Sequence, residues 1–474
     1  MSIPNIPAAV LQQINAQQAW HYRVVPFEQI GEQLHLYCPE EVNRQALADE
    51  LSLVLNQAVV LHPCSEEQLR TLLSKHYRLS QESEATSLTA RDLADGGNNL
   101  IERLVNETAG LGGSDIHFEP YEHYARVRLR IDGALVEKFR LPLEGYPSLV
   151  NQVKIKANLD IAEKRLPQDG RIQHRWGEKP VDIRVSTLPT MYGEKIVMRL
   201  LINRTDQLEL SDLGLRDKAL EDYLSATRRP SGITLISGPT GSGKTTTLYA
   251  TLKLLNEIDR NIITIEDPIE YTLEGINQVQ LREAIGLDFA SALRTFLRQD
   301  PDTIMVGEIR DLDTARMAVR ASLTGHQVLS TIHTNNAWGI VSRLLDLGLP
   351  AYLLADTLNA AVAQRLVRTL CPHCKQARYI TNEDLPAGFA KIEDPMLVYE
   401  PQGCPNCYFT GYTGRKGIYE VILIDRELAQ AIRQKELDVR DILREKGIKS
   451  LGEQAFALLR SGNTALHEVY PLLT

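Results

Sequence analysis

The sequence predicts a multidomain α/β protein built on a parallel sheet that carries a phosphate-binding loop. An apolar run at residues 233–237 breaks into glycine and resumes as a helical pattern, which is typical of strand, loop and helix in succession. Further strand-like runs at residues 261–270, ending in a carboxylate cluster, and at 303–306 and 327–333 are separated by helical patterns, as in a parallel sheet covered on both faces. A chain of 474 residues is too long for one hydrophobic core, so two to four domains are expected.

The composition is that of an ordinary globular protein, with 43% hydrophobic and 24% charged residues. The net charge of -9 argues against a broad nucleic-acid-binding surface, because phosphate backbones are held mainly by clustered Lys and Arg. The first residues lack the basic and apolar regions of an export signal, and the most apolar long stretch, residues 351–367, includes Asp356 and Arg365. We therefore expect no export signal, no membrane span and no direct contact with nucleic acid.

The first part of the chain predicts a small α/β domain and a linker. Residues 1–78 mix helical patterns with alternating runs such as residues 34–38. Residues 79–97 are rich in Ser, Glu, Thr and Asp and end in two glycines, which is typical of a flexible linker.

Residues 98–205 begin with a helical pattern and continue as strands with charges at alternate positions. Arg126, Arg128 and Arg130 alternate with apolar residues, so their guanidinium groups share one face of a strand. They belong either to a solvated face paired with Asp115 and Glu119 or to a binding site, and the pattern leaves both interpretations open.

The phosphate-binding loop itself reads Gly-Pro-Thr-Gly-Ser-Gly-Lys-Thr-Thr. Its glycines let consecutive backbone N–H groups close around phosphate oxygens at the positive end of the following helix. Lys244 would reach the β- and γ-phosphates of ATP, and the hydroxyl of Thr245 would ligate Mg²⁺. The residues expected to bind nucleotide here are Gly238, Pro239, Thr240, Gly241, Ser242, Gly243, Lys244, Thr245 and Thr246.

Acidic residues follow two of the predicted strands. Phosphoryl transfer to water needs a group that orients the water and a metal ion beside the phosphates. Glu308 follows the strand at 303–306 and is expected in the Mg²⁺ shell, directly or through water. Glu270 is our candidate for polarising the water, with Glu266 and Asp267 as alternatives.

Histidines and arginines supply the remaining parts of a hydrolytic site. His333, and also His326, are candidates for sensing the γ-phosphate, although a single His is often structural. An arginine against a γ-phosphate offsets the charge of the transition state, and a neighbouring subunit that supplies one would switch hydrolysis on. The candidate arginines are Arg184, Arg199, Arg294, Arg298 and Arg310.

Four of the six cysteines form two Cys-x-x-Cys pairs, Cys371 with Cys374 and Cys404 with Cys407, while the other two stand alone. In a chain without an export signal this spacing favours a metal site over disulfides. Four thiolates suit tetrahedral Zn²⁺ in a closed structural site, so His373 is not needed as a ligand.

Taken in order, these motifs resemble the assembly ATPases of bacterial type II secretion and type IV pilus systems. The resemblance runs from about residue 98 to 421 and includes Ser-Asp-Ile-His-Phe-Glu-Pro, Arg-Ile-Asp-Gly, Pro-Gln-Asp-Gly-Arg, the box Ile-Glu-Asp-Pro-Ile-Glu and both cysteine pairs. It implies a homohexamer, in which a PAS-like module joins a RecA-like ATPase domain and ATP hydrolysis drives assembly of a pilus or a secretion pseudopilus. It also implies that Arg184 and Arg199 approach the nucleotide from the PAS-like side, and that Arg294, Arg298, Arg310 and Arg415 complete its arginine set.

The resemblance implies partners as well. A motor without a membrane segment needs a docking protein and an inner-membrane platform protein, so the expected location is cytoplasmic and peripheral to the inner membrane, with membrane association only through partners. The expected domains are 1–78 for docking, 79–97 as linker, 98–205 PAS-like, 206–370 RecA-like, 371–420 for the zinc subdomain and 421–474 as a C-terminal helical region.

Two alternatives remain at this point. One is the motor of a pilus used for DNA uptake, which would need the same ATPase. The other is a catalytically quiet nucleotide-binding scaffold, and the joint presence of Lys244, Glu270 and Glu308 argues against it.

Overall fold

The structure is a computed structural model. It describes Ile6, 8–11, 13–14, 16–31, 33–40, 42–55, 57–65, 68–69, 72–73 and 97–473, the last range without 178, 203–208, 387–388, 390–391 and 393–394. The chain divides into two compact units, one of residues 1–88 with 137–140 and one of residues 89–136 with 141–474. The expected linker at 79–97 lies outside the described residues except for its last residue.

The first unit contains a three-stranded sheet in the order β1-β2-β3. Strand β2 (Gln33–Pro39) pairs antiparallel with β1 (Val25–Ile30) and parallel with β3 (Ala58–Cys64). Helices α1 (Ala8–Leu11), α2 (Ala16–His21) and α3 (Arg44–Leu55) accompany it. The run at 34–38 is a strand, as predicted, and both isolated cysteines are buried in the core of this unit.

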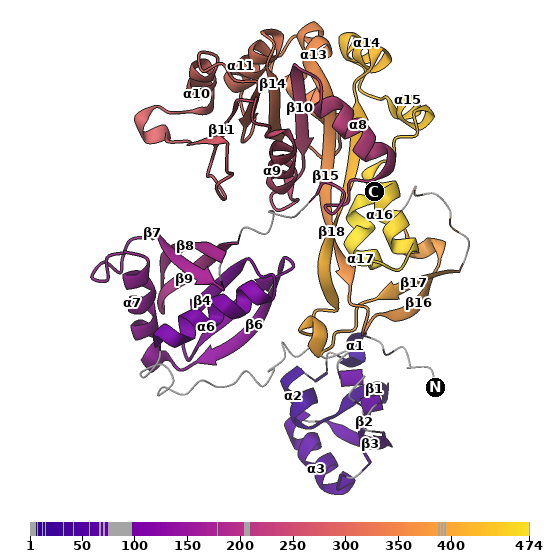
Figure 1. Ribbon diagram of the computed structural model, residues 1–474. Coiled ribbons are helices and arrows are strands. Elements are labelled where there is room, and N and C mark those ends of the chain that lie inside the picture. The colour runs from indigo at the N-terminus through magenta and orange to yellow at the C-terminus, as the bar shows by residue number, and fades with distance from the viewer. Residues whose placement is uncertain are drawn as a thin grey trace. The chain divides into compact units, whose positions relative to one another are not determined.

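The second unit begins with a six-stranded antiparallel sheet in the order β6-β5-β4-β9-β8-β7, against which two helices pack (Figure 1). The strands are β4 (Asp115–Pro120), β5 (Ala125–Ile131), β6 (Ala134–Leu141), β7 (Gln168–Trp176), β8 (Lys179–Thr190) and β9 (Gly193–Ile202), and the helices are α6 (Gly97–Gly110) and α7 (Tyr146–Lys156). Strict alternation buries the apolar residues of β5 and leaves its charged residues on the other face. This charged face bears on the candidate site.

The rest of the second unit is a seven-stranded sheet in the order β12-β11-β13-β14-β10-β15-β18. Its strands are β10 (Gly232–Ser237), β11 (Ile262–Glu266), β12 (Asn277–Gln280), β13 (Thr303–Val306), β14 (Gln327–Ile332), β15 (Leu358–Leu370) and β18 (Tyr412–Leu423). The expectation of a parallel sheet is correct for the first six and wrong for β18, which is antiparallel to β15. The chain leaves the sheet along β15 and returns beside it, so the direction reverses.

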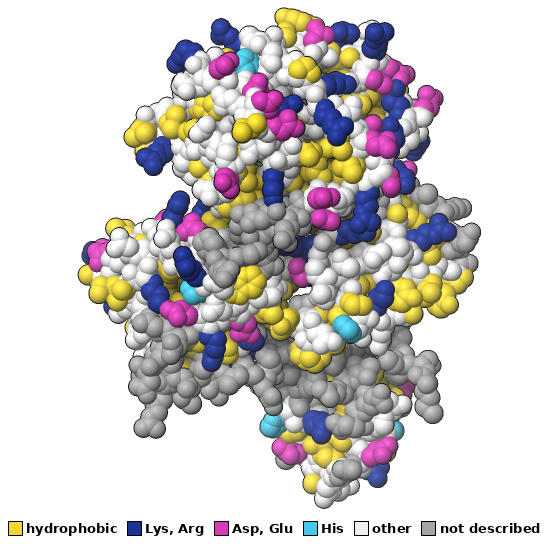
Figure 2. Space-filling view, in the orientation of Figure 1, with side chains coloured by type: hydrophobic (Ala, Val, Ile, Leu, Met, Phe, Trp, Pro, Cys, Tyr) yellow, Lys and Arg dark blue, Asp and Glu magenta, His cyan; other side chains and the backbone are white. Residues whose placement is uncertain are grey.

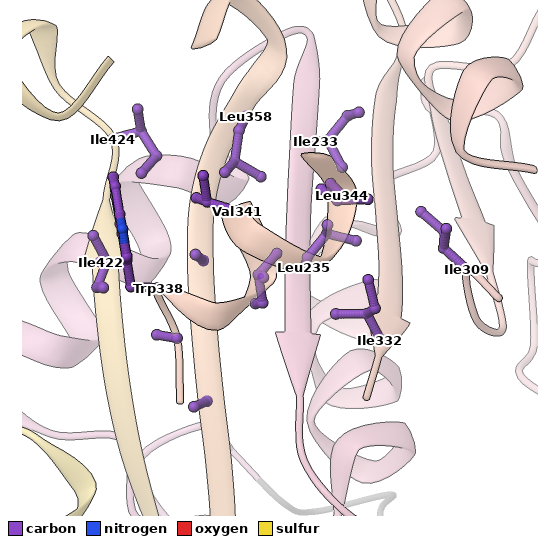
Figure 3. Close-up of a cluster of buried hydrophobic side chains, with 14 of the residues drawn as sticks. Ile233, Leu235, Ile309, Ile332, Trp338, Val341, Leu344, Leu358, Ile422 and Ile424 are labelled. Carbon is purple, nitrogen blue, oxygen red and sulfur yellow. The ribbon is translucent and has the colours of Figure 1, made fainter. Parts of the chain in front are cut away.

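Helices cover both faces of this sheet. Helices α8 (Asp217–Thr227) and α9 (Lys244–Leu255) bury apolar residues against one face. The other face is covered by α10 (Phe289–Phe296), α11 (Leu312–Leu323), α12 (Gly339–Asp346), α13 (Ala351–Thr357), α14 (Arg426–Gln434), α15 (Arg440–Glu445), α16 (Leu451–Arg460) and α17 (Leu466–Val469). Figure 3 shows Ile233 and Leu235 of β10 beside Val341 and Leu344 of α12.

Beyond the sheet, β15 and β18 continue side by side as a ribbon (Figure 1). The segment between them contains a two-stranded antiparallel sheet of β16 (Gln376–Ile380) and β17 (Met396–Glu400), with the cysteine pairs at its base. Acidic and basic side chains are interspersed over the described part of the face in Figure 2. Among the described helices, none has the length and apolar character needed to cross a membrane.

Candidate active site

Four adjacent strands of the seven-stranded sheet end at the same edge. The phosphate-binding loop follows β10, His333 follows β14, Glu308 lies just beyond β13, and Asp267 follows β11. The strands are parallel, so these groups from four separate stretches of sequence share one edge. The predicted nucleotide site is therefore assembled at the carboxyl edge of this sheet.

Two glycines let the phosphate-binding loop pack tightly against β15. Gly238 has φ +153°, and a Cβ there would lie 2.5 Å from the carbonyl oxygen of Gln364. Gly243 has φ +88°, and its Cβ would lie 2.8 Å from Nε2 of the same glutamine. Any side chain at either position would strain the backbone and meet a neighbour. The loop then enters α9 at Lys244, whose first turn presents free backbone N–H groups.

The Lys244 ammonium group of this loop bonds to backbone carbonyl oxygens instead of a carboxylate. The Nζ of Lys244 donates to the carbonyl oxygens of Gly238 and Pro239 at 2.8 and 3.2 Å. Burial lowers the pKa of Lys244, Glu308 opposes that shift, and Arg365 adds to it. The buried hydroxyl of Ser242 has no hydrogen-bond partner. The Lys244 ammonium group and the unpartnered Ser242 hydroxyl are therefore both suited to binding the oxygens of a phosphate chain.

Glu308 lies just beyond β13 at this edge of the sheet, close enough to influence the charge of Lys244. One of its oxygens accepts a hydrogen bond from Arg310, and the other lies 3.5 Å from Nε2 of His333. The Glu308 side chain is 17% exposed, whereas His333 and Arg310 are more than half exposed. Both neighbours can therefore move away when a metal ion or phosphate enters. The structure brings together three of the predicted site residues here.

Glu270 and Arg184 also meet, although they are far apart in the sequence. An Nη1 atom of Arg184 lies 3.5 Å from the Glu270 carboxylate, and its Nη2 donates to the carbonyl oxygen of Ile269. Arg184 comes from β8 of the six-stranded sheet, and Glu270 comes from the loop after β11. The predicted base thus faces a cation from the other sheet.

The two alternative carboxylates have different surroundings. Glu266 is the last residue of β11 and is 3% exposed. It accepts hydrogen bonds from Tyr249, from Thr264 at 2.5 Å and from Gln278 at 3.0 Å, so its oxygens are occupied by neutral donors. Asp267 is exposed and lies 4.0 Å from Arg310. Glu266 is therefore wrong as a candidate for contacting the attacking water.

Arg199 and Arg184 lie opposite each other on β9 and β8, and Arg171 of β7 continues the same row. All three line a pocket of about 460 Å³, to which Pro268 of the loop after β11 also contributes. Arg199 is held by Asp115 at 2.9 Å. The sequence analysis includes Arg171 only as the last residue of the Pro-Gln-Asp-Gly-Arg motif, and the pairing of β7 with β8 is what shows that it adjoins Arg184.

Of the two interpretations of the charged face of β5, the structure supports the one in which the arginines pair with Asp115 and Glu119. Arg126 and Arg128 donate to the Glu119 carboxylate at 2.9 and 2.8 Å, and Arg130 lies 3.6 Å from Asp115. Burial alone would raise the pKa of Glu119, but hydrogen bonds from Arg128, Arg126 and Lys195 outweigh it and lower that pKa to about 2.

Other predicted residues lie away from this edge. His326 precedes β14, so the length of that strand, about 20 Å, separates it from His333. Its Nδ1 lies 2.9 Å from the Ala321 carbonyl oxygen and 3.1 Å from the Thr324 hydroxyl. The prediction that His326 senses phosphate is wrong, because parallel strands bring only their carboxyl ends to the site.

The three remaining predicted arginines lie on α10, just after α10 and on the β15–β18 ribbon. Arg294 lies on α10, and Arg298, just after it, donates to the Arg294 carbonyl oxygen at 3.1 Å. Both side chains are exposed. Arg415 lies on the β15–β18 ribbon, about 16 Å past the end of β10, and pairs with Asp132 at 3.5 Å.

Arg365 is a residue that the sequence analysis did not select. It lies on β15 next to the loop, where a Cβ on Gly238 would be 3.2 Å from its Nη1. It donates to the carbonyl oxygens of Gln364 at 2.9 Å and of Asn335 at 2.7 Å. It thus ties the loop after β14, which carries His333, to the phosphate-binding loop. The motif Gln-Arg-Leu-Val-Arg was visible, but only the sheet order shows that it adjoins β10.

The four cysteines of the two pairs converge as predicted. Their sulfur atoms all lie within 4.8 Å of one another, and Cys371–Cys404, Cys374–Cys407 and Cys404–Cys407 are 3.8, 3.7 and 3.7 Å apart. Sulfurs bound to one tetrahedral Zn²⁺ at ~2.3 Å would be about 3.8 Å apart. Backbone N–H groups of Cys404 and Gly411 donate to Cys407 at 3.2 Å. The donor set fits a closed metal site.

Comparison with known proteins gives matches over the whole length. The family described as "Type II/IV secretion system protein" matches residues 94–471, and the MshEN domain matches residues 4–83. The chain is 41% identical to the type II secretion system protein E of Aeromonas hydrophila, over 98% of this chain and 97% of that one. It is 40% identical to the type IV pilus assembly ATPase PilB of Pseudomonas aeruginosa, over 94% and 83%.

Among solved structures, the crystal structure of the pilus retraction motor PilT with bound ADP is 26% identical, with a TM-score of 0.52. The match covers 78% of this chain and 96% of that one.

Proposed function

The chain belongs to the type II/IV secretion system protein family, and from that premise we propose that it is a ring-forming motor whose subunits hydrolyse ATP to assemble a type IV pilus or a type II secretion pseudopilus. Its ATPase activity is that of its secretion and pilus relatives. Relatives from both systems match nearly the full chain, at 41% and 40% identity, so the proposal names the class of machine.

One observation supports this function most strongly. Loop, carboxylate and histidine, each from a different strand, share the carboxyl edge of a single sheet. That arrangement supplies phosphate positioning, a metal ligand and a polar group near the γ-phosphate, as phosphoryl transfer requires. A quiet scaffold would need only the loop.

We assign the roles as follows. Lys244 leaves the carbonyls of Gly238 and Pro239 and binds the β- and γ-phosphates, with the loop N–H groups around them. Thr245, whose side chain is exposed, and Glu308 hold Mg²⁺, which supplies charge neutralisation at the phosphates. Glu270 polarises the attacking water, and His333 contacts the γ-phosphate.

The arginines divide between the subunit's own site and a neighbour's. Arg184 and Arg199, on the six-stranded sheet that we propose is PAS-like, approach the chain's own nucleotide, and Arg310 lies beside Glu308. Arg294 and Arg298 are exposed, so their side chains are available for a role in the next subunit of a homohexamer. Arg415 stands on the ribbon paired with Asp132 and would join the set only after that pair opens.

The remaining parts would connect the motor to its machine. We propose Zn²⁺ in the tetracysteine cluster as a structural ion. Residues 1–78 would bind a docking protein, and the ring would act on an inner-membrane platform protein from the cytoplasmic side, peripheral to the membrane. The segments 98–205, 206–370, 371–420 and 421–474 are the proposed PAS-like, ATPase, zinc and C-terminal parts.

The test uses mixtures of wild-type and Glu270→Gln protein at a fixed total concentration, with assembly followed by light scattering. Glu270→Gln alone should bind ATP yet turn over at least about 10²-fold more slowly, on the scale of losing a positioned catalytic group. In mixtures, activity should fall more steeply than the wild-type fraction, because subunits of one ring depend on one another. A proportional fall would rule out the coupled ring, and full activity of the variant would move the base to Asp267.

A further inference from the structure

The loop that carries Glu270 has no regular secondary structure of its own. Residues 267–274, between β11 and β12, form bends and turns. Its position must therefore come from side-chain contacts with neighbouring elements. Three such contacts come from the short edge strand β12. Gln280 accepts from the Ile269 N–H at 3.0 Å, and Gln278 accepts from the Leu273 N–H at 2.7 Å and donates to the Tyr271 carbonyl oxygen at 3.2 Å.

The fourth contact comes from the helix of the phosphate-binding loop. Tyr249 lies on α9, and the backbone N–H of Glu270 donates to its hydroxyl at 3.3 Å. The same hydroxyl donates to the buried carboxylate of Glu266 and lies 3.4 Å from Nε2 of Gln278. The ring of Tyr249 meets that of Tyr271 edge-on, with centroids 4.6 Å apart. One hydroxyl thus joins α9, β11, β12 and the Glu270 loop.

The donor in this network is the phenol of Tyr249. Burial and the neighbouring Glu266 raise the pKa of Tyr249 far above its ordinary value, which favours the protonated phenol. Glu266 in turn is fixed by Thr264 and Gln278. The hydrogen bond between Tyr249 and Glu266 therefore has one orientation, and the phenolic oxygen is left to accept from the Glu270 N–H.

We infer that Tyr249 is a positioning residue for ATP hydrolysis, which sets the placement of Glu270 relative to Lys244 and Thr245 on the same helix. The inference rests on the proposed role of Glu270. Because α9 begins at Lys244, anchoring the Glu270 loop to α9 ties the base to the phosphates by a rigid element. A displacement of about 1 Å at such a site can cost 10²-fold in rate.

The experiment compares Tyr249→Phe with a matched control, Tyr223→Phe. Tyr223 is likewise fully buried against α9, but its hydroxyl bonds Thr251 of that helix at 2.7 Å instead of the backbone of the Glu270 loop. Both variants lose one buried hydroxyl and keep the ring. We expect Tyr249→Phe to lower kcat about 10- to 100-fold, while KM for ATP and the Kd of a non-hydrolysable analogue stay within about threefold. Tyr223→Phe should retain the wild-type kcat.

A double variant separates positioning from a general structural role. In the Glu270→Gln background, adding Tyr249→Phe should change kcat less than about threefold, because the group that it positions is already lost. An unchanged kcat in Tyr249→Phe overturns the inference, as does a full further loss in the double variant. Wild-type activity of Glu270→Gln alone would instead refute the proposed base.

Loss of folding in Tyr249→Phe would leave a second route. Gln278→Leu removes two of the three β12 contacts with the same loop, keeps the contact of Gln280 with Ile269, and leaves α9 intact. It should also lower kcat with nucleotide affinity kept, and an unchanged kcat in this folded variant would overturn the positioning network.

Discussion

The charged face of the six-stranded sheet and the carboxyl edge of the seven-stranded sheet use the same residue types in opposite ways. On the first, Glu119 has Arg126, Arg128 and Lys195 around it, each at about a hydrogen-bond distance. On the second, Lys244 rests on carbonyl oxygens, and Glu270 has a single cation 3.5 Å away. Charges that saturate one another stabilise a fold, whereas charges left with spare capacity are available to a ligand.

The largest effect expected from this contrast concerns two lysines. Lys244→Ala removes charge from the phosphates, so ATP turnover should fall at least about 10³-fold with little change in melting temperature. Lys154→Met leaves Glu194, its buried partner at 2.5 Å, without a counter-charge and should destabilise the six-stranded module by about 3–5 kcal/mol. Turnover assays and thermal melts of both variants measure this. A Lys244→Ala protein that hydrolyses ATP normally would end the assignment of the loop.

Arg365 sharpens the comparison within one strand. Arg365→Lys keeps the charge but lacks the planar guanidinium whose Nη1 and Nη2 reach Gln364 and Asn335 separately, so we expect kcat to fall about tenfold. Arg368→Lys on the same strand loosens the pair with Glu468 and should affect stability without slowing turnover. Steady-state ATPase assays compare kcat of the two variants. Equal kcat values would contradict a role for Arg365 at the site.

The tetracysteine cluster extends the contrast to metal binding. Metal analysis should find one zinc per chain. Chelation should open residues 371–407 to protease before nucleotide binding is lost, because the ion would be the one ligand shared by all four sulfurs. Limited proteolysis with mass spectrometry locates the cuts. A metal-free protein that resists protease in this segment would remove the zinc assignment.

The smallest expected effect is a loss of stability of the six-stranded sheet at low pH, where Glu119 becomes protonated. The pKa of Glu119 is lowered in the folded state, so its stabilisation is full above the unfolded pKa of ~4.3 and is lost as pH falls toward about 2. Hydrogen exchange of β4 and β5 should therefore rise below pH ~4.3 in wild type, with a weaker pH dependence in Glu119→Gln.

An exposed pair provides the control for that measurement. The hydrogen bond from Arg440 lowers the pKa of Asp438 to about 2 as well, but the Asp438 side chain is 58% exposed. Water and salt screen such a pair, so Asp438→Asn should leave the acid response of the protein unchanged. An equal response to both substitutions would show that burial does not distinguish the two pairs.

Much of the site could be predicted because strand, loop and helix leave local patterns. The loop at 238–246, the acidic and histidine residues after three strands and the two cysteine pairs are all read from short stretches. The features that could not be predicted depend on the order of strands in the sheet. Arg365 becomes a neighbour of Gly238 only because β15 lies beside β10, and His326 and His333 differ only in which end of β14 they occupy.

Glu266 illustrates a second kind of limit. It stands one residue before Asp267 in the same acidic box, yet it is the last residue of a strand buried on both faces. Its carboxylate is tolerated because Tyr249, Thr264 and Gln278 come from three elements to satisfy it. No local pattern reports that donors from three elements will meet.

The ribbon of β15 and β18 has a mechanical consequence. Strand β15 is continuous over 13 residues, pairs with the strand of the phosphate-binding loop at one end and leads directly into Cys371 at the other. With ~3.3 Å per residue, the part beyond β10 is a stiff arm roughly 23 Å long. A tilt of about 5° at the sheet would sweep its tip by about 2 Å. A small rotation of β15 beside the phosphate-binding loop would therefore displace the cysteine cluster by a larger distance.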